Sequence, residues 1–144
     1  MLALLLCGCA SAKPTRPEPR PQPAPADADC VLKHGSHDTL SLKQLPANIR
    51  DALTKLAGAM ADRGEFFNAT DFVVKPAPFK RFIRAGEAEG KWYVWYEHGG
   101  IAYWRQIVIF AIDSAGVVHI QSDVHARNVS LCETTDLLLH GNAP

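Results

Sequence analysis

The sequence predicts an α+β domain in which one amphipathic helix packs on a roughly four-stranded antiparallel meander sheet. Two observations carry this prediction. One stripe of apolar residues at helical spacing is followed by four segments typical of strands. The strand segments are joined by short, glycine-containing loops, which favour antiparallel neighbours.

The helix is expected from Pro46 to Arg63. Proline suits the first helical position, and Gly64 suits a stop just after the last one. The large apolar residues of this segment recur every three or four positions and so share one face: Leu45, Ile49, Leu53, Leu56 and Met60. This stripe is expected to be buried against the sheet.

The four strands are expected at residues 79–85, 91–98, 101–112 and 117–124. Gly99 and Gly100 supply the positive φ angles that a two-residue hairpin turn needs. With that turn, Tyr96 lies opposite Tyr103 and Trp95 lies opposite Trp104. The C-terminal residues 125–144 contain an apolar run that is too short to assign to a helix or a strand.

The central hairpin contains all the tryptophans and tyrosines of the chain. In the expected register one face holds Trp95 and Trp104, followed by Val108 and Phe110, and we assign it to the core under the helix. The opposite face is assigned to recognition of another protein, because Trp, Tyr and Arg are enriched at binding hot spots. Two other interpretations are cross-strand pairs that only stabilise the hairpin and a stacking pocket for a carbohydrate. The candidate binding residues are Trp92, Tyr96, Tyr103 and Arg105.

The composition and motifs of the chain exclude several classes of function. The chain has 144 residues, a one-domain length, and its 15 basic residues balance 15 acidic ones, so no net field attracts nucleic acid. Apolar residues make up 47% of the chain, which is typical of a globular protein. HExxH, GxSxG, GxGxxG and P-loop patterns are absent from the sequence. We therefore predict no cofactor and no metal site of those types.

The N-terminus begins with a short apolar run that cannot cross a hydrocarbon core of about 30 Å. Leu6-Cys7-Gly8-Cys9 resembles the bacterial lipobox, in which Leu and two small residues precede the modified cysteine. The resemblance covers only this segment. It implies that residues 1–8 are a signal peptide and that Cys9 becomes lipidated. Ala10, in place of Asp, implies the outer membrane, with the domain facing the periplasm.

A proline-rich segment follows the expected anchor. Six of the ten prolines lie within residues 14–25. Proline fixes φ and lacks a backbone donor, so the segment favours polyproline II at about 3.1 Å per residue. Residues 9–29 are expected to form the lipidated cysteine and a spacer, and residues 30–144 the globular domain. The other interpretation of the segment is a ligand for a proline-binding module.

Two cysteines remain once Cys9 is assigned to the anchor and Cys7 to the signal peptide. Cys30 and Cys132 would bracket the domain, and exported compartments permit disulfides. A bridge would close a loop of about 100 residues, which chain-entropy models value at about 4–5 kcal/mol. The alternatives are two separate buried thiols and a Cys–His nucleophile.

These observations favour a non-catalytic binding module of the cell envelope: an inhibitor, an immunity protein or an accessory subunit of an envelope assembly. Its predicted partners are the membrane, through the lipid, and another envelope protein. The first alternative is a small metal-assisted hydrolase, because His119, Asp123 and His125 would share one face of the last strand. The second alternative is a passive structural lipoprotein.

Overall fold

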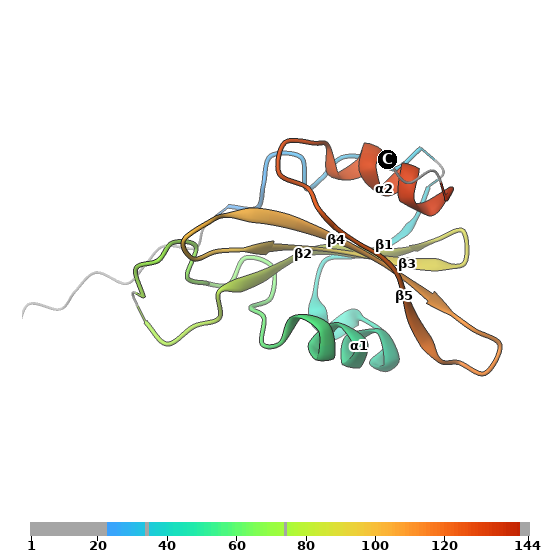
Figure 1. The fold of residues 1–144 in the computed structure, drawn as a ribbon, viewed down its shortest axis with the longest axis horizontal. Helices are drawn as coiled ribbons and strands as arrows, with labels where there is room; N and C mark the ends of the chain where they lie inside the picture. The colour runs from blue at the N-terminus through green and yellow to red at the C-terminus, as the bar shows by residue number, and fades with distance from the viewer. Residues whose placement is uncertain (1–22, 34, 74, 142–144) are drawn as a thin grey trace, which may run out of the picture.

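The computed structural model describes residues 23–33, 35–73 and 75–141. The predicted signal peptide, Cys9 and residues 14–22 of the proline-rich segment lie outside these ranges. The described chain confirms the α+β class, with helices on both faces of one antiparallel sheet (Figure 1). Within the same ranges, no helix has the length and apolar composition needed to cross a membrane.

The sheet is a meander, because its strands are ordered in space as they are in the chain. It has five strands rather than about four, since a three-residue strand precedes the predicted ones and pairs with the first of them. Such a short edge strand leaves no alternating pattern in the sequence. The strands are β1 (His37–Thr39), β2 (Lys80–Ala88), β3 (Lys91–His98), β4 (Trp104–Ile112) and β5 (Val118–His125).

The turn between β3 and β4 is longer than predicted. It spans residues 99–103, so His98 pairs with Trp104 and Trp95 pairs with Ile107. The predicted pairs of Trp95 with Trp104 and of Tyr96 with Tyr103 are therefore wrong. Each β3 residue meets a β4 residue three positions later than expected, and an odd shift turns every β4 side chain to the other face.

Helix α1 (Ala47–Ala57) covers one face of the sheet, preceded by a short 3₁₀ turn, η1 (Leu42–Gln44). It ends six residues before the predicted Arg63, because Gly58 adopts a φ of 74° and stops it. The buried positions of the helix are members of the predicted stripe, Ile49 and Leu53, together with Ala57. They pack on the side chains of three strands: Phe82, Val94, Tyr96, Val108 and Phe110.

The opposite face is covered by the two ends of the folded chain. Helix α2 (Leu131–Leu139) lies there beside the segment that begins at residue 23 (Figure 1). Residues 23–29 were expected in the linker, but Ala28 is fully buried in this second core. The folded unit therefore begins before Cys30. Beneath this layer lie Tyr93, Trp95, Ile107 and Ile109.

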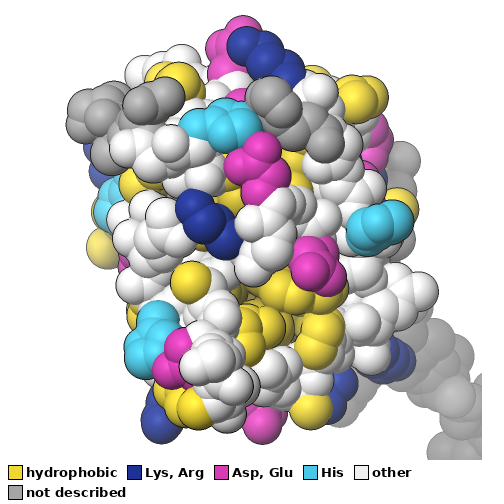
Figure 2. Space-filling model, turned by 90° about the vertical axis from the view of Figure 1, so that its right-hand side faces the viewer, with side chains coloured by type: hydrophobic (Ala, Val, Ile, Leu, Met, Phe, Trp, Pro, Cys, Tyr) yellow, Lys and Arg dark blue, Asp and Glu magenta, His cyan; other side chains and the backbone are white. Residues whose placement is uncertain are grey.

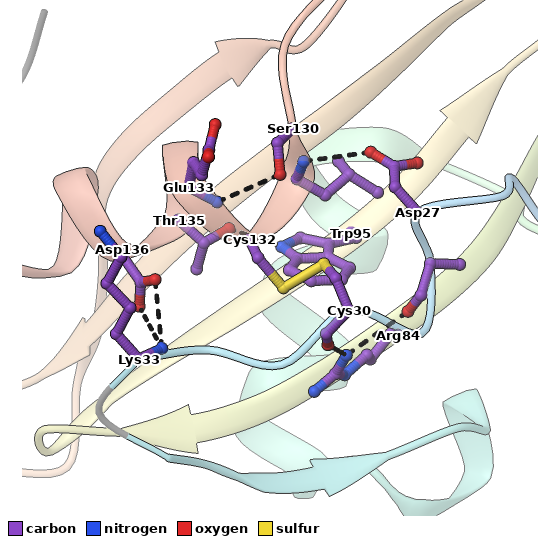
Figure 3. Close-up of a disulfide and its surroundings, with 12 residues drawn as sticks. Asp27, Cys30, Lys33, Arg84, Trp95, Ser130, Cys132, Glu133, Thr135 and Asp136 are labelled. Carbon is purple, nitrogen blue, oxygen red and sulfur yellow. Dashed lines mark hydrogen bonds between the residues drawn. A yellow bond between two sulfur atoms is a disulfide. The ribbon is translucent and has the colours of Figure 1, made fainter.

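The predicted disulfide is present. Cys30 and Cys132 are bonded, with their Cα atoms 6.1 Å apart, and the bridge lies over Trp95 (Figure 3). The Trp95 indole N–H donates to Thr135 Oγ1 at 2.8 Å. The backbone N–H of Lys33 donates to both oxygens of Asp136 at 3.2 Å. The N-terminal segment and α2 are thus held to each other as well as to the sheet.

Candidate functional site

The alternative interpretation of the last strand, a metal site formed by His119, Asp123 and His125, does not fit the described structure. β5 carries one extra residue, Gln121, opposite the step from Ile109 to Phe110 of β4, which makes a bulge. The bulge leaves Asp123 and His125 on the α1 face but turns His119 to the other face. His119 instead contacts Asp113, with 2.8 Å between Nε2 and Oδ2. Among the described residues, no group of three His, Cys, Asp or Glu side chains is placed to hold a metal ion.

The four predicted binding residues do not share a face, because of the register change. Trp92 and Tyr96 pack against the core under α1, and Tyr96 is buried. Arg105 lies on the α2 side, where it binds the Asp27 carboxylate and the carbonyl oxygen of Val129. Tyr103 lies in the β3–β4 turn and is half exposed. The prediction that these four residues share one recognition face is therefore wrong.

The predicted core set divides in a similar way. Trp95 is buried under α2, whereas Val108 and Phe110 are buried under α1. Trp104 belongs to neither core and is partly exposed at the end of the sheet. Of the two tryptophans assigned to the predicted core, only Trp104 borders an open surface in the described part of the chain.

That surface is an apolar groove of about 680 Å³, which we call the end groove. It lies where α1 ends and where the β3–β4 turn meets the chain leading into β2. Its lining includes Pro78, Phe79, Ile101 and Trp104. Of the described lining residues, Lys80 and His98 carry ionisable side chains. Both side chains form hydrogen bonds within the protein. Lys80 donates to the carbonyl of Ala57, and His98 Nδ1 lies 2.7 Å from the carbonyl oxygen of Gly99.

One wall of the end groove is a stack of flat rings. His98 and Trp104 lie nearly parallel, with ring centroids 3.9 Å apart, and His125 lies 5.3 Å from Trp104. The Trp104 indole N–H donates to Gln106 Oε1 at 3.1 Å. Burial lowers the pKa of His98; the hydrogen bond to the Gly99 carbonyl opposes this, but with the charges of Lys80 and His125 the net shift is downward. The faces of these rings are thus stacked on one another.

Two loops border the groove and expose apolar side chains. The loop of residues 66–79 is closed by Asn68, whose side-chain amide donates to the carbonyl of Ala77 at 2.8 Å. Gly99 packs directly on this loop, because a Cβ there would overlap the carbonyl oxygen of Asn68. This close approach, rather than a two-residue turn, accounts for Gly99. The exposed apolar side chains on the two loops are Phe72, Val73, Phe79, Ile101 and Tyr103.

A buried ion pair holds the β3–β4 turn and the start of the folded chain. Glu97 accepts from Arg81 Nε at 2.7 Å and from the Tyr103 hydroxyl at 2.8 Å. Burial and this bond to Glu97 raise the pKa of Tyr103, so its hydroxyl stays protonated as a donor. Arg81 also donates to the carbonyl of Pro23 at 2.9 Å. The linker therefore joins the domain at the same end of the sheet as the groove.

The opposite end of the molecule has a different character. A hollow of about 490 Å³ lies there between α1 and the β4–β5 hairpin. Its lining mixes Ala52 and Val118 with Asp51 and Lys55. Figure 2 shows charged and histidine side chains scattered around the apolar ones on this end. The end groove is thus the more apolar of the two.

Residues 66–79 are not identified as functional from the sequence, although residues 72–74 form a short apolar run outside any strand-like alternation. Comparisons of the chain with known protein families, curated proteins and solved structures find no match. The chemistry of the end groove is therefore the basis for the interpretation that follows.

Proposed function

We propose that the chain is a cell-envelope lipoprotein whose folded domain binds another envelope protein through the end groove and its two loops. The lipobox resemblance at Cys9 supports the anchor. The observation that carries the binding function is the apolar end groove, whose lining residue Ile101 is 96% exposed. Contiguous apolar surface of this kind usually marks an interaction site.

The character of the groove favours recognition over catalysis. Its ionisable side chains, Lys80 and His98, bond to the backbone of the domain rather than to each other. Trp104 lines the groove, and tryptophan is among the residues most enriched at hot spots, where truncation costs about 2 kcal/mol or more of binding. An inhibitor, an immunity protein and an accessory subunit all require this kind of surface.

The proposal is tested by site-specific photo-crosslinking in native envelopes, using the full chain. A photoreactive residue at Ile101 is compared with one at Val31, which is 84% exposed but lies away from the groove. We expect a discrete crosslinked partner from position 101 alone. Trp104→Ala should abolish this crosslink, and Val31→Ser should not.

Equal crosslinking from both positions, or none from position 101, would contradict binding at the groove and favour a passive lipoprotein. The anchor is tested separately, by mass spectrometry of acyl groups on Cys9 and by release of Cys9→Ser on osmotic shock. A Cys9→Ser variant that still fractionates with membranes would contradict the lipid anchor.

A further inference from the structure

We propose that the outer edge of β5 is a second docking site, which takes an extended segment of a partner protein as a sixth, antiparallel strand of the sheet. The segment pairs with residues 118–120 and places alternate apolar side chains in the hollow of about 490 Å³ between α1 and the β4–β5 hairpin, which we call the edge hollow. This site is separate from the end groove, so the inference goes beyond the function proposed above.

The outer side of β5 is open in the described part of the chain. β5 is the last of the five strands in sheet order, with β4 as its neighbour. The backbone N–H of Asp113 donates to the carbonyl of Val117 at 3.0 Å, so that carbonyl points toward β4. Because hydrogen bonds alternate along an antiparallel strand, Val118 and Ile120 point their backbone groups outward. Among the described residues, no backbone hydrogen bond reaches these outward groups.

The first half of β5 lacks the features that commonly block an open edge. Folded proteins protect edge strands by keeping them short, or by charged residues, prolines and bulges. The other edge strand, β1, has only three residues, and the second half of β5 has the bulge at Gln121 and the charged Asp123. Residues 118–120 read Val-His-Ile, and the Ile120 side chain is 51% exposed. This stretch is therefore the part of the sheet edge that can accept another strand.

The edge hollow determines the chemistry of the incoming strand. Val118 and Ile120 pair with Ile112 and Phe110, on the face of the sheet that α1 covers. Residues directly opposite each other in an antiparallel pair share a face, so the partner side chains beside Val118 and Ile120 point toward α1. The lining of the hollow there includes Ala52 and Val118. An extended segment with apolar residues at every second position matches both the open backbone and this apolar strip.

A helix beside an open strand edge suits strand addition. In that mode of recognition, main-chain hydrogen bonds supply affinity, and pockets for alternate side chains supply specificity. Figure 1 shows α1 and the tip of the β4–β5 hairpin on the same side of the sheet. One flank of α1, with Asn48, Ala52 and Lys55, forms one wall of the edge hollow, and Val118 lies in the other. Asp51 and Lys55 have opposite charges, so the lining favours neither an acidic nor a basic segment.

A separate partner fits this edge better than a second copy of the chain. In a pair of copies, the side chains that fill the edge hollow have to come from residues 118–120 themselves. Val118 already packs against the core under its own α1 and is not free to enter the hollow of another copy. The bulge at Gln121 also ends regular pairing directly after these residues.

The test uses the full chain with Cys7 and Cys9 replaced by serine, and amide hydrogen exchange measured by NMR. The probe is a peptide with blocked ends, Lys-Thr-Val-Thr-Val-Thr-Lys, in which valine occupies every second position of the central segment. At a peptide concentration about ten times its Kd, we expect the N–H groups of Val118 and Ile120 to exchange about tenfold more slowly. The N–H groups of Ile101 in the end groove and Asp38 in β1 are the internal references and should not change.

Two N-methylated peptides are the matched controls. In the antiparallel arrangement the valines turn their N–H groups toward β5, so N-methylation of both valines should abolish the slowing. The threonines turn their N–H groups away, so N-methylation of the threonines should leave the slowing intact. The reverse pattern, or equal slowing by all three peptides, would overturn antiparallel strand addition.

Two variants of the protein complete the test. Ile120→Lys places a charge on the exposed edge and should abolish the slowing at Val118, whereas Ile101→Lys should not. An unchanged exchange rate in the parent chain, or slowing at Ile101 alone, would overturn the proposal. Slowing that grows with protein concentration in the absence of peptide would also overturn it, because a second copy would then occupy the edge. None of these outcomes alters the crosslink expected from position 101, so the two proposals fail separately.

Discussion

Replacing Trp95 by alanine removes the largest fully buried side chain of the domain from the core under α2. The ring is 0% exposed, it packs against the disulfide, and the Arg84 guanidinium lies 5.1 Å from its centroid. Truncation of a buried tryptophan costs about 3–5 kcal/mol. Loss of the bond to Thr135 adds about 1 kcal/mol. The sum is a large part of the roughly 5–15 kcal/mol that stabilises a typical domain.

The comparison variant is Trp104→Ala. Trp104 is partly exposed, and its loss removes two ring contacts worth about 0.5–1.5 kcal/mol each. We therefore expect Trp95→Ala to lower the free energy of unfolding by about 1–5 kcal/mol more than Trp104→Ala. Urea denaturation followed by far-ultraviolet circular dichroism measures the difference. Equal losses of unfolding free energy in the two variants would refute the reasoning. They would indicate that both rings lie in one core, which is the arrangement that the predicted two-residue turn at Gly99-Gly100 requires.

Two further perturbations probe the layer over Trp95. Replacing both Cys30 and Cys132 by serine should lower the free energy of unfolding by about 4–5 kcal/mol, because the bridge closes a loop of about 100 residues; an unchanged melting temperature would contradict this. Burial alone would raise the pKa of Asp38, but hydrogen bonds from Ser36 and Tyr93 and the charge of Arg84 outweigh it and lower that pKa. The resulting stability is present above the unfolded pKa of about 3.9 and is lost as the pH falls through the lower folded pKa. Asp38→Asn should therefore flatten the acid limb of the stability curve measured by urea unfolding between about pH 5 and pH 2, and an unaltered limb would argue against the cluster.

The sequence predicts the fold class because its strongest patterns are local. The spacing of the apolar stripe that contains Ile49 and Leu53 is typical of a helix, and the structure has a helix there. The aromatic strand at residues 91–98 appears in the structure with the predicted bounds. By contrast, the Gly99-Gly100 pair does not by itself determine the length of the turn between the two strands. Only Gly100 of the pair has a positive φ, and Gly99 is needed for contact with a distant loop. That tertiary requirement could not be deduced from the hairpin, and it reversed the face of every β4 side chain.

The layer over the second face was also hidden, for different reasons. Ser130 caps the N-terminus of helix α2, and its hydroxyl accepts from the backbone N–H of Glu133 at 3.4 Å. Serine followed three residues later by glutamate is a recognised helix-start pattern, and it was the available signal for α2. The packing of residues 23–29 had no such signal, because proline and alanine there resemble the linker that precedes them. The predicted disulfide was the one sequence feature that joined these two segments.

The disulfide also has a consequence for the order in which the domain is completed. The elements that build the core under α1 all precede α2 in the chain. The second core cannot close until α2 follows, because Cys132, Thr135 and Asp136 bond to partners made at least 40 residues earlier. Until then Tyr93, Trp95, Ile107 and Ile109 have no helix over them. Docking of α2 therefore decides when the domain stops presenting an apolar sheet face to its surroundings.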